Sequence, residues 1–450
     1  MPASPPKSIA TGARETAAAV WRAALAAGDV APLVQRHLRL AGSTLTAGGV
    51  TIDLDRAGQI LVLGVGKAGA SMARAVEAVL GERVSEGFVV VKDGYRVPTS
   101  RIEVAEAGHP VPDARGEEAA GRLLALASSA TERDLVLVLV SGGGSALTPA
   151  PAAPITLGEK QVVTRLLLEA GATIGELNAV RKHLSRFKGG LLARAAQPAT
   201  VVTLALSDVV GDPLDVIASG PTAPDSSTFG DALEVLAARG VLDRVPPAVV
   251  ERLRAGARGA IEETPKPGDR LFTRVSNLVI GNNALVVQAA AAEAERCGYR
   301  PYVLTRALQG EARDVARDLV ERARILPGPV CMIAGGETTV TVTGTGRGGR
   351  CQEVALAAAL ELGPADDLVV LAAGTDGTDG PTDAAGALVD AGTVGRGRAQ
   401  GLDARRALDD NDAYRFLGAT ADRIVTGPTN TNLLDVYLVV RPPSIDRATL

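Results

Sequence analysis

Short apolar runs alternate with longer segments of helical periodicity along most of the chain. In the first half, four runs have the length and composition of buried strands: 60–63, 87–92, 134–140 and 201–206. Between them lie segments whose apolar residues recur every three or four positions: 15–38, 68–80, 116–127 and 164–196, the last broken near 171–175. The run at 134–140 is apolar almost throughout, as a parallel strand covered on both faces should be. This alternation predicts βαβ units and a doubly wound parallel sheet.

The alternation begins again in the second half of the chain. Strands are predicted at 277–280, 302–305, 330–334, 368–372 and 433–440, and helices at 283–296, 311–324 and 348–362. The alternating stretch 338–343 predicts a hairpin or a bent edge strand. The short polar segment 264–270 carries two prolines and is the best linker candidate. We therefore expect an N-terminal domain over 1–265 and a C-terminal α/β domain over 271–450, with their loops facing a shared cleft.

Composition narrows the class of protein. A chain of 450 residues is too long for one ordinary core, and 46% hydrophobic residues are enough to build two. Aromatic residues make up only 2%, which argues against base-stacking platforms, and a net charge of −4 lacks the electrostatic footprint of a nucleic-acid binder. The three cysteines are far apart, which favours a reducing compartment over a disulfide framework or a zinc site. With no signal peptide in the first fifteen residues and no apolar run of about 20 residues, we expect a soluble cytoplasmic protein with no membrane partner.

Four glycine-rich loops carry the candidate chemistry, and each follows an apolar run. They are GVGKAG (64–69), SGGGS (141–145), TGRGGR (345–350) and GTDGTDG (374–380). Glycine loops at strand ends let backbone N–H groups approach phosphate oxygens, because no Cβ holds the ligand away. The first and third loops also carry cations and the fourth carries acids, so the set predicts a phosphorylated substrate together with a divalent metal.

The first loop allows two interpretations. Gly64, Gly66 and Gly69 form a G-x-G-x-x-G pattern between a strand and a helix, where a dinucleotide site requires it. The acidic residue that such a site needs, Asp93, comes somewhat late. Lys67 instead places a flexible point charge where a transferred phosphoryl group could lie. A tight turn with an exposed lysine is the structural alternative.

The second loop supplies candidate anion-binding groups. Gly142, Gly143 and Gly144 between Ser141 and Ser145 form a nest suited to phosphate or carboxylate, although a plain turn is possible. G-x-S-x-G is absent, which disfavours a hydrolase nucleophile. The segment 178–190 concentrates basic residues, including Arg181, and predicts either an anion clamp or a solvated charged face.

The remaining candidates are acidic residues and one arginine. Asp208 follows a strand, where it could serve a metal, act as a base or cap a turn. Glu337 follows two glycines, and Arg350 precedes a helix, where its fork would point into the cleft beside a helix N-terminus. Asp376 lies in the fourth loop, whose spacing is not that of an EF-hand. Asn282, directly before a predicted helix, is a further candidate for binding substrate or phosphate.

In order, these segments resemble the type II glycerate kinase family, the glycerate 2-kinases with a C-terminal MOFRL domain. The resemblance runs from about 15 to about 440 through GVGKA, GHPVPD, SGGGSAL, LNAVRKHLSRFKGG, LSDVVGDPLDVIASGPT, GGETTVTV with GRGGRCQE, and GTDGTDGPTDAAG. It implies two α/β domains, one Rossmann-like, with the active site between them. It also implies ATP-dependent phosphorylation of D-glycerate at the 2-hydroxyl with Mg²⁺ or another divalent metal. A homodimer is possible.

The resemblance further implies that Lys67 and Arg350 are the active-site pair. For the metal, our own hypothesis is that nucleotide phosphates hold it together with one or two carboxylates from among Asp208, Glu337 and Asp376. Cys351 stands where the family often has asparagine. Because some members carry the label hydroxypyruvate reductase, an NAD(P)-dependent reductase using 64–69 is the alternative. The chain has only three histidines, so it offers few acid–base groups for such a reductase. A non-enzymatic sugar-phosphate sensor is a third interpretation, although no partner-binding module is recognisable.

Overall fold

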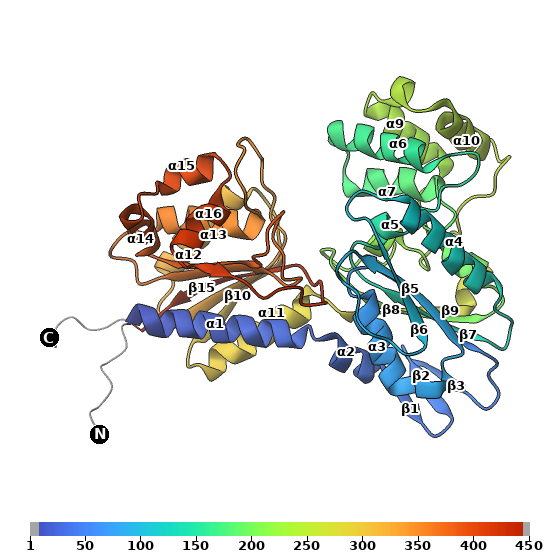
Figure 1. The fold of residues 1–450 in the computed structure, drawn as a ribbon, viewed down its shortest axis with the longest axis horizontal. Helices are drawn as coiled ribbons and strands as arrows, with labels where there is room; N and C mark the ends of the chain where they lie inside the picture. Colours follow the sequence, from blue (N-terminus) through green and yellow to red (C-terminus); the bar gives the residue numbers. More distant parts are fainter. Residues whose placement is uncertain (1–8, 444–450) are drawn as a thin grey trace. The chain divides into compact units, whose positions relative to one another are not determined.

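The structure is a computed structural model that describes residues 9–443 and divides into two compact units (Figure 1). The continuous unit comprises 30–281. The split unit comprises the chain up to 29 and from 282 onward. The first eight of the fifteen residues in which no signal peptide was recognised lie outside the described residues.

The continuous unit is built on a six-stranded parallel sheet of order β6-β5-β4-β7-β8-β9. Its strands are β4 (Ile60–Val65), β5 (Glu86–Lys92), β6 (Ile102–Ala107), β7 (Leu135–Val140), β8 (Thr200–Leu206) and β9 (Val275–Gly281). Counted along the chain the order is 3-2-1-4-5-6, that of the doubly wound nucleotide-binding folds, and it reverses between β4 and β7. Ligands of such sheets bind at the carboxyl ends of the strands beside this switch point.

Helices of the continuous unit form two groups. Around the sheet lie α2 (Val30–His37), α3 (Gly69–Leu80), α4 (Ala114–Ser128), α5 (Gly144–Leu147) and α8 (Leu191–Ala195). A separate helical cluster, green in Figure 1, contains α6 (Leu157–Glu169), α7 (Ile174–His183), α9 (Phe229–Ala238) and α10 (Pro247–Ala257). Three of its helices begin at a threonine whose side chain and N3 carboxylate form a reciprocal capping box: Thr156, Thr173 and Thr228. The cluster has its own core, which includes Val163, Leu177, Phe229 and Leu253.

A small antiparallel sheet also belongs to the continuous unit. Its strands are β1 (Leu38–Ala41), β2 (Thr44–Ala47) and β3 (Val50–Asp53), which the sequence analysis did not predict.

The split unit contains a mixed six-stranded sheet of order β10-β11-β15-β12-β13-β14. Its strands are β10 (Arg300–Leu308), β11 (Val330–Gly336), β12 (Val369–Gly374), β13 (Gly386–Asp390), β14 (Arg423–Ile424) and β15 (Asp435–Arg441). Because β15 runs antiparallel to both β11 and β12, its first residue lies at the edge where those two strands end. The sequence analysis predicted the α/β class of this domain; a sheet of mixed direction is what the structure adds.

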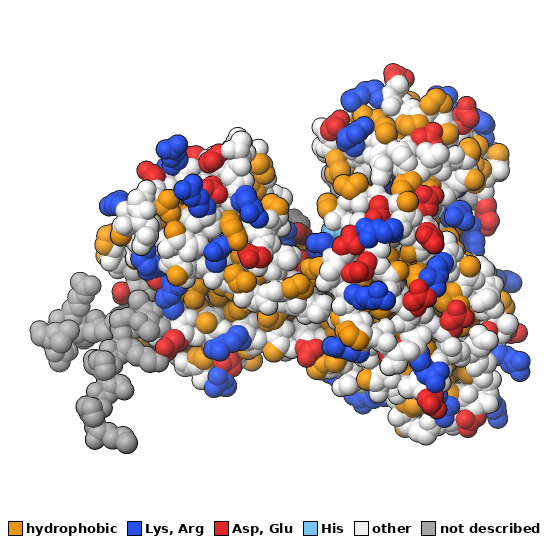
Figure 2. Space-filling view, viewed as in Figure 1, with side chains coloured by type: hydrophobic (Ala, Val, Ile, Leu, Met, Phe, Trp, Pro, Cys, Tyr) orange, Lys and Arg blue, Asp and Glu red, His pale blue; other side chains and the backbone are white. Residues whose placement is uncertain are grey.

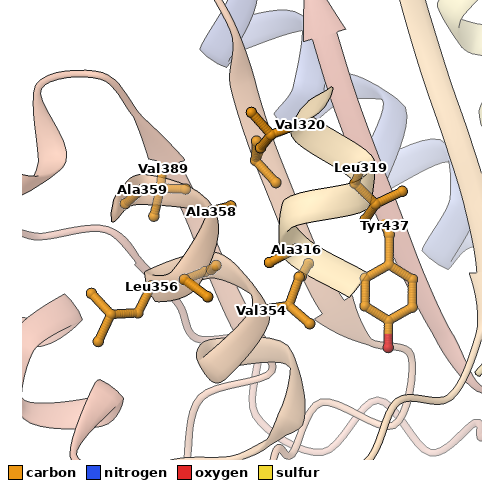
Figure 3. Packing of buried hydrophobic residues seen from close by; sticks show 14 of the residues in the cluster. Ala316, Leu319, Val320, Val354, Leu356, Ala358, Ala359, Val389 and Tyr437 are labelled. Atoms are coloured by element: carbon orange, nitrogen blue, oxygen red, sulfur yellow. The ribbon is translucent and has the colours of Figure 1, made fainter. Parts of the chain in front are cut away.

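Aliphatic packing holds the split unit together. Its helices are α11 (Asn283–Arg296), α12 (Ala312–Ile325), α13 (Arg350–Glu361), α14 (Thr393–Ala399), α15 (Ala404–Asp409) and α16 (Ala413–Ala419). Figure 3 shows Leu319 and Val320 of α12 near Val354 of α13, with the ring of Tyr437 beside them. These side chains are almost fully buried, so van der Waals packing and loss of water contact stabilise the unit despite its few aromatic residues.

The N-terminal helix belongs to the split unit. The segment 15–38, predicted as one helix, breaks after Gly28 into α1 (Ile9–Ala27) and α2. The apolar face of α1 packs on α11 and β15, whereas α2 packs on α3. Arg14 of α1 also donates to Asp422 at 2.8 Å. The chain therefore passes from one unit to the other between these two helices.

Two other segments differ from their sequence-based description. The expected linker at 264–270 is followed by β9, which pairs with β8, so the chain leaves the continuous unit only after 281. The stretch 338–343 is an extended loop whose single ladder contact is a bridge from Thr339 to Glu311, not a hairpin. Its backbone bonds instead join Thr339 to Gly310 and Ala312 at the start of α12, and Val342 is exposed.

Charged side chains of both signs are interspersed over the face shown in Figure 2, with no broad area of one sign. Among the described residues no single helix is long and apolar enough to cross a membrane, although the bent pair formed by 12–27 and 30–37 meets the length and composition criteria together.

Candidate active site

The loops that follow β4 and β7, on either side of the switch point, are interlocked. Gly66 has φ +123°, and a Cβ there would lie 2.3 Å from the carbonyl oxygen of Ser141. The amide of Lys67 donates to the carbonyl of Gly142 at 2.9 Å, and the amide of Ala68 donates to Ser141 Oγ at 3.0 Å. Only glycine can occupy position 66, because any side chain would force the two loops apart.

This interlocking changes the role of the first loop. The amide of Gly66 donates to Val90 O and that of Gly69 to Gly66 O, so each of the N–H groups of residues 66–69 already has a protein acceptor. Gly64 lies within β4, where a Cβ would meet the side chain of Val89 at 2.5 Å. Gly64 and Gly66 therefore serve close packing, and the loop presents the Lys67 side chain instead of an open backbone cradle.

The SGGGS loop keeps its amides available. Gly143 has φ +85° and precedes the short helix α5. Among the residues that the structure describes, the amides of Gly142, Gly143 and Gly144 donate to no protein acceptor. A Cβ at Gly143 would lie 3.0 Å from His109 Nε2 and 3.5 Å from Lys67 Cγ, so these two side chains border the loop. The arrangement fits the expected anion nest.

This loop forms one wall of a cavity of about 620 Å³, which we call the SGGGS cavity. Gly143 and Ser145 line it together with His109, and its charged lining residues are Lys160, Arg165, Arg181 and Lys188. No aspartate or glutamate is among its described lining residues. A pocket with four cations, a nest of amides and no acid attracts an anion strongly.

Arg181 is the predicted residue that the structure most clearly places in this cavity. Its side chain is half-buried and makes no hydrogen bond or ion pair with any described residue. Burial lowers the pKa of Arg181 below its ordinary value, and no carboxylate counters the effect. An arginine always stays charged at neutral pH, so its fork is left to bind a ligand.

Two buried lysines can add positive charge when an anion binds. Lys188 is 1% exposed and donates to the carbonyl of Ser145 at 2.7 Å. Burial, followed by the nearby charges of Lys160 and Arg181, holds the pKa of Lys188 well below its usual range. Lys160 donates to the carbonyl of Pro149, and burial together with Arg181 lowers its pKa to about 7. Both lysines are held where an anion would relieve their mutual repulsion.

Asp208 and the segment after it lie at the same edge of the sheet. Asp208 follows β8, the neighbour of β7, and is half-buried. Further along, Ser219 Oγ lies 2.9 Å from Ser145 Oγ, and Ala218 packs against Gly144. Ala218 and Ser219 both have positive φ, 51° and 61°, which are strained conformations for residues with a Cβ. Strain of this kind gathers at ligand sites, and here it borders the SGGGS loop.

The basic segment 181–188 is neither one clamp nor a solvated face. Lys182 is 3% exposed and pairs with Asp225 at 3.2 Å. His183 is also buried and lies 3.1 Å from Glu263. Arg181 and Lys188 alone among its cations line the SGGGS cavity.

In the split unit, the predicted residues gather around a buried aspartate. Asp435 pairs in register with Gly336 of β11 and Gly374 of β12. Arg350, the first residue of α13, donates Nε to Asp435 Oδ2 at 2.6 Å and Nη2 to Oδ1 at 2.8 Å. Its Nη1 lies 2.9 Å from Glu337 Oε1. The arginine fork is therefore held by two carboxylates instead of projecting freely.

The electrostatics of this cluster follow from burial and pairing. Burial disfavours the charged guanidinium of Arg350, but the bidentate bond to Asp435 outweighs it and holds the pKa of Arg350 above its ordinary value. Burial, and then the charge of Asp435, raises the pKa of Tyr437, whose hydroxyl donates to Asp435 at 3.0 Å. A charged Arg350 is therefore fixed in one orientation.

The N-terminus of α13 is not open to an anion. Asp379 accepts hydrogen bonds from the amides of Cys351 at 3.1 Å and Gln352 at 2.9 Å. Burial raises the pKa of Asp379 to about 6, although these amides pull in the opposite direction. The protein's own carboxylate therefore occupies the position that the sequence analysis offered to a ligand.

Two of the predicted metal ligands, Glu337 and Asp376, lie at this edge of the split unit's sheet, whereas Asp208 belongs to the continuous unit. Glu337 bonds to Arg350, and Asp376 Oδ1 accepts from the amide of Thr378 at 3.0 Å. Oxygens of Asp376 and Asp435 approach the Cβ position of Gly374 within 3.5 Å and 3.2 Å. Within 9–443 no group of three or more His, Cys, Asp or Glu side chains is arranged to hold a metal ion by itself. Carboxylate oxygens suit Mg²⁺, which usually takes one or two of them and completes its shell with phosphates and water.

Asn282 has a structural role in the fold. Its side chain accepts from the amide of Leu285 at 3.2 Å and caps α11. An asparagine before an apolar periodic segment is the usual signature of such a cap.

Sequence reasoning missed four residues of these clusters. They are His109, Lys160, Lys188 and Asp435, of which Lys188 was noted only as part of a basic segment. His109 stands in the quoted GHPVPD segment, a signal that could have been used. Lys160 lies in an ordinary amphipathic helix and Asp435 at the start of an apolar strand, so neither had a local signal.

Comparison with known proteins agrees with these observations. Residues 16–254 match the family model described as "Domain of unknown function (DUF4147)", and 330–435 match the MOFRL family. A glycerate 2-kinase of Pyrococcus horikoshii is 39% identical over 96% of this chain and 98% of its own length. A D-glycerate 2-kinase of Thermotoga maritima is 42% identical over 86% and 91%, respectively.

A solved structure and one differently named relative complete the comparison. The crystal structure of a Thermotoga maritima glycerate kinase has a TM-score of 0.82 and 39% identity, covering 95% of this chain and 99% of that one. A protein of Agrobacterium vitis named putative hydroxypyruvate reductase is 41% identical over 85% of this chain and 99% of its own. The chain thus belongs to a two-domain family defined by DUF4147 and MOFRL. That family is the glycerate kinase family.

Proposed function

We propose that this protein transfers the γ-phosphoryl group of ATP to the 2-hydroxyl of D-glycerate, giving 2-phosphoglycerate and ADP. The observation that carries the proposal is the SGGGS cavity, whose cations and free amides suit a phosphate or carboxylate. The near full-length relatives named glycerate 2-kinase supply the substrate and the position of transfer.

The residues of the continuous unit bind and neutralise charge in this proposal. Lys67, presented by the interlocked loop, offsets the charge that spreads over the transferred phosphoryl group. Arg181 and the SGGGS amides hold an anionic group of the substrates. Asp208 is the proposed acceptor of the hydroxyl proton, because it lies at the carboxyl edge beside β7.

Arg350 is the proposed second cation for the transferred group. Asp435 fixes its orientation through two hydrogen bonds, and Glu337 holds the remaining nitrogen. Glu337 is the more exposed of the two carboxylates, at 45% against 1%, so its bond is the one that a phosphate oxygen can replace. Preorganisation of this kind lets a charge contact act without reorienting during the reaction.

A divalent cation fits the acidic edge of the split unit. Glu337 and Asp376 would hold Mg²⁺ together with nucleotide phosphates, in keeping with their oxygen donors. When bound, the ion would neutralise phosphate charge and polarise the phosphoryl group.

The reductase named among the relatives is the second candidate. It requires the Gly64–Gly69 loop to receive a pyrophosphate on free amides. In the structure the amides of 66–69 are already bonded to protein acceptors, which favours the kinase.

One coupled assay tests the proposal. Purified protein is incubated with D-glycerate, ATP and Mg²⁺ and coupled directly to enolase without a mutase. Phosphoenolpyruvate formation is expected, since enolase accepts the 2-phosphate but not the 3-phosphate. ADP release without phosphoenolpyruvate would indicate another acceptor position. Oxidation of NAD(P)H on hydroxypyruvate, with no ADP, would support the reductase.

Binding of anionic substrate should weaken as pH rises above about 7. The pKa of Lys160 is about 7 in the empty cavity, and an anion beside the amine raises it. Binding above pH 7 must therefore take up a proton, so affinity falls by up to about tenfold per pH unit until the pKa of the bound state is reached. Calorimetric titration of D-glycerate and of a non-hydrolysable ATP analogue at pH 8, in buffers of different ionisation enthalpy, measures this uptake.

Lys160→Met should reduce the proton uptake to what Lys188 contributes, whereas Lys92→Met, which alters a lysine outside the cavity, should retain the full uptake. Identical uptake in the wild type and in Lys160→Met would contradict the assignment.

A further inference from the structure

A second cavity in the continuous unit is also rich in cations. It has a volume of about 360 Å³ and lies between α7, α8 and the end of α10. Arg186, Arg194 and Arg252 line it together with His183, Lys182 and Glu262. We call it the arginine cavity. None of the proposed catalytic or substrate-binding residues lines it.

Most charges around this cavity are balanced by the protein. Lys182 pairs with Asp225 and Asp215 at 3.2 and 3.3 Å. Glu263 lies 3.1 Å from His183 and 3.1 Å from Lys266. Arg194 lies 3.3 Å from Glu262, and its Nη2 donates to Glu263 O at 2.8 Å.

Two arginines are left without a carboxylate. Arg252 donates Nε to the carbonyl of His183 at 2.9 Å, and Arg186 donates Nε to that of Pro151 at 3.2 Å. Both terminal nitrogens of each guanidinium have no acceptor among the described residues. Burial lowers the pKa of Arg252, and no acid offsets it. Each arginine is thus fixed through Nε, and its two terminal nitrogens, Nη1 and Nη2, stay available for bidentate hydrogen bonds to a phosphate.

We propose that the arginine cavity is a second anion-binding site, for a small molecule that carries a phosphoryl dianion. Arg186 and Arg252 supply the forked donors, and Arg194 adds a third guanidinium. The volume is at the lower end of the usual range for ligand pockets, which favours a phosphorylated metabolite of a few carbons or free phosphate over a nucleotide.

The chain links this site to the SGGGS cavity. Within 181–188, Arg181 and Lys188 line the SGGGS cavity, whereas Lys182, Ser185 and Arg186 line the arginine cavity. A ligand in the arginine cavity therefore restrains the same eight residues that present cations to the first cavity. We expect a ligand in one cavity to change the affinity of the other through this shared segment, and any such coupling must be reciprocal.

Equilibrium dialysis with radiolabelled inorganic phosphate tests the proposal and does not depend on catalysis. At saturation the wild type should bind two phosphates per chain. Arg186→Met and Arg252→Met should each bind one, and Arg181→Met should also bind one. The matched control Arg254→Met, an exposed arginine on the same helix α10, should bind two.

Two phosphates retained in both Arg186→Met and Arg252→Met would overturn the proposal. So would a single wild-type site that Arg181→Met abolishes. Arg186 is exposed, so its replacement carries little risk to folding even if Arg252→Met, which frees the carbonyl of His183, loses structure. Repeating the titration with sn-glycerol 3-phosphate distinguishes the sources: tighter binding than phosphate assigns the site to an ester, and equal or weaker binding assigns it to free phosphate.

Discussion

Lys67→Ala should lower kcat by about 10²-fold or more, because it removes a positive charge from the phosphoryl group as negative charge develops on it. The substitution should leave the packing of the two glycine loops unchanged. The backbone amide of residue 67, which locks the two glycine loops together through Gly142, is kept in the alanine variant. The enolase-coupled assay gives kcat, and circular dichroism verifies that the fold is intact.

Arg350→Ala should also lower kcat by about 10²-fold or more, and Arg350→Lys should be a poor enzyme because it lacks the bidentate fork. Lys92→Ala serves as the control and should retain full activity, since Lys92 lies outside the SGGGS cavity. A near-normal kcat in both Lys67→Ala and Arg350→Ala would refute the assignment of this pair.

Asp435→Asn should reduce the free energy of unfolding of the split unit by about 2–3 kcal/mol. It removes the buried carboxylate that holds Arg350 through two hydrogen bonds. Loss of one partner of a fully buried ion pair costs about 3–5 kcal/mol. We expect a smaller cost here because the Arg350 side chain is 31% exposed and retains its ion pair with Glu337. The chain's single tryptophan, Trp21, is buried in α1 of the split unit, so its fluorescence during urea unfolding reports on this unit.

Tyr437→Phe is the matched comparison. It keeps the carboxylate and removes only the hydroxyl that donates to Asp435 and contacts Thr338 N and Oγ1 at 3.2 and 3.1 Å, so it should cost about 1–2 kcal/mol. If the urea midpoint of Trp21 fluorescence were the same in Asp435→Asn as in the wild type, Asp435 would not be an important partner of Arg350.

The sequence predicted the location of candidate site residues best where a glycine-rich loop directly follows a predicted strand. The predicted strands at 60–63, 134–140 and 201–206 coincide, to within a few residues, with β4, β7 and β8, so the loops after them meet at one edge. SGGGS and Arg181 were predicted as an anion site, and the structure brings both to one cavity. Their roles in binding substrate stay predictions.

Long-range pairing accounts for what the sequence did not reveal. Lys160 becomes part of the SGGGS cavity only because the helical cluster brings α6 beside the loop after β7. Asp435 acquires its partners because β15 is inserted between β11 and β12, which no local pattern encodes. The free amides expected in the first loop are absent for a similar reason: the SGGGS loop accepts from those of Lys67 and Ala68, and Val90 of the neighbouring strand β5 accepts from that of Gly66.

The insertion of the continuous unit into the split unit affects how the chain is made. During synthesis α1 emerges before the continuous unit, and its partners α11 and β15 lie more than 250 residues later in the chain. At about 5–20 residues per second, α1 waits for at least roughly 13 seconds, and for up to a minute or more, before it can pack. During that time its apolar face, including Trp21 and Val20, has no native surface to cover it, while residues 30–281 can complete their own core. The continuous unit can therefore fold first on the ribosome, while the apolar face of α1 stays uncovered until α11 and β15 have been made.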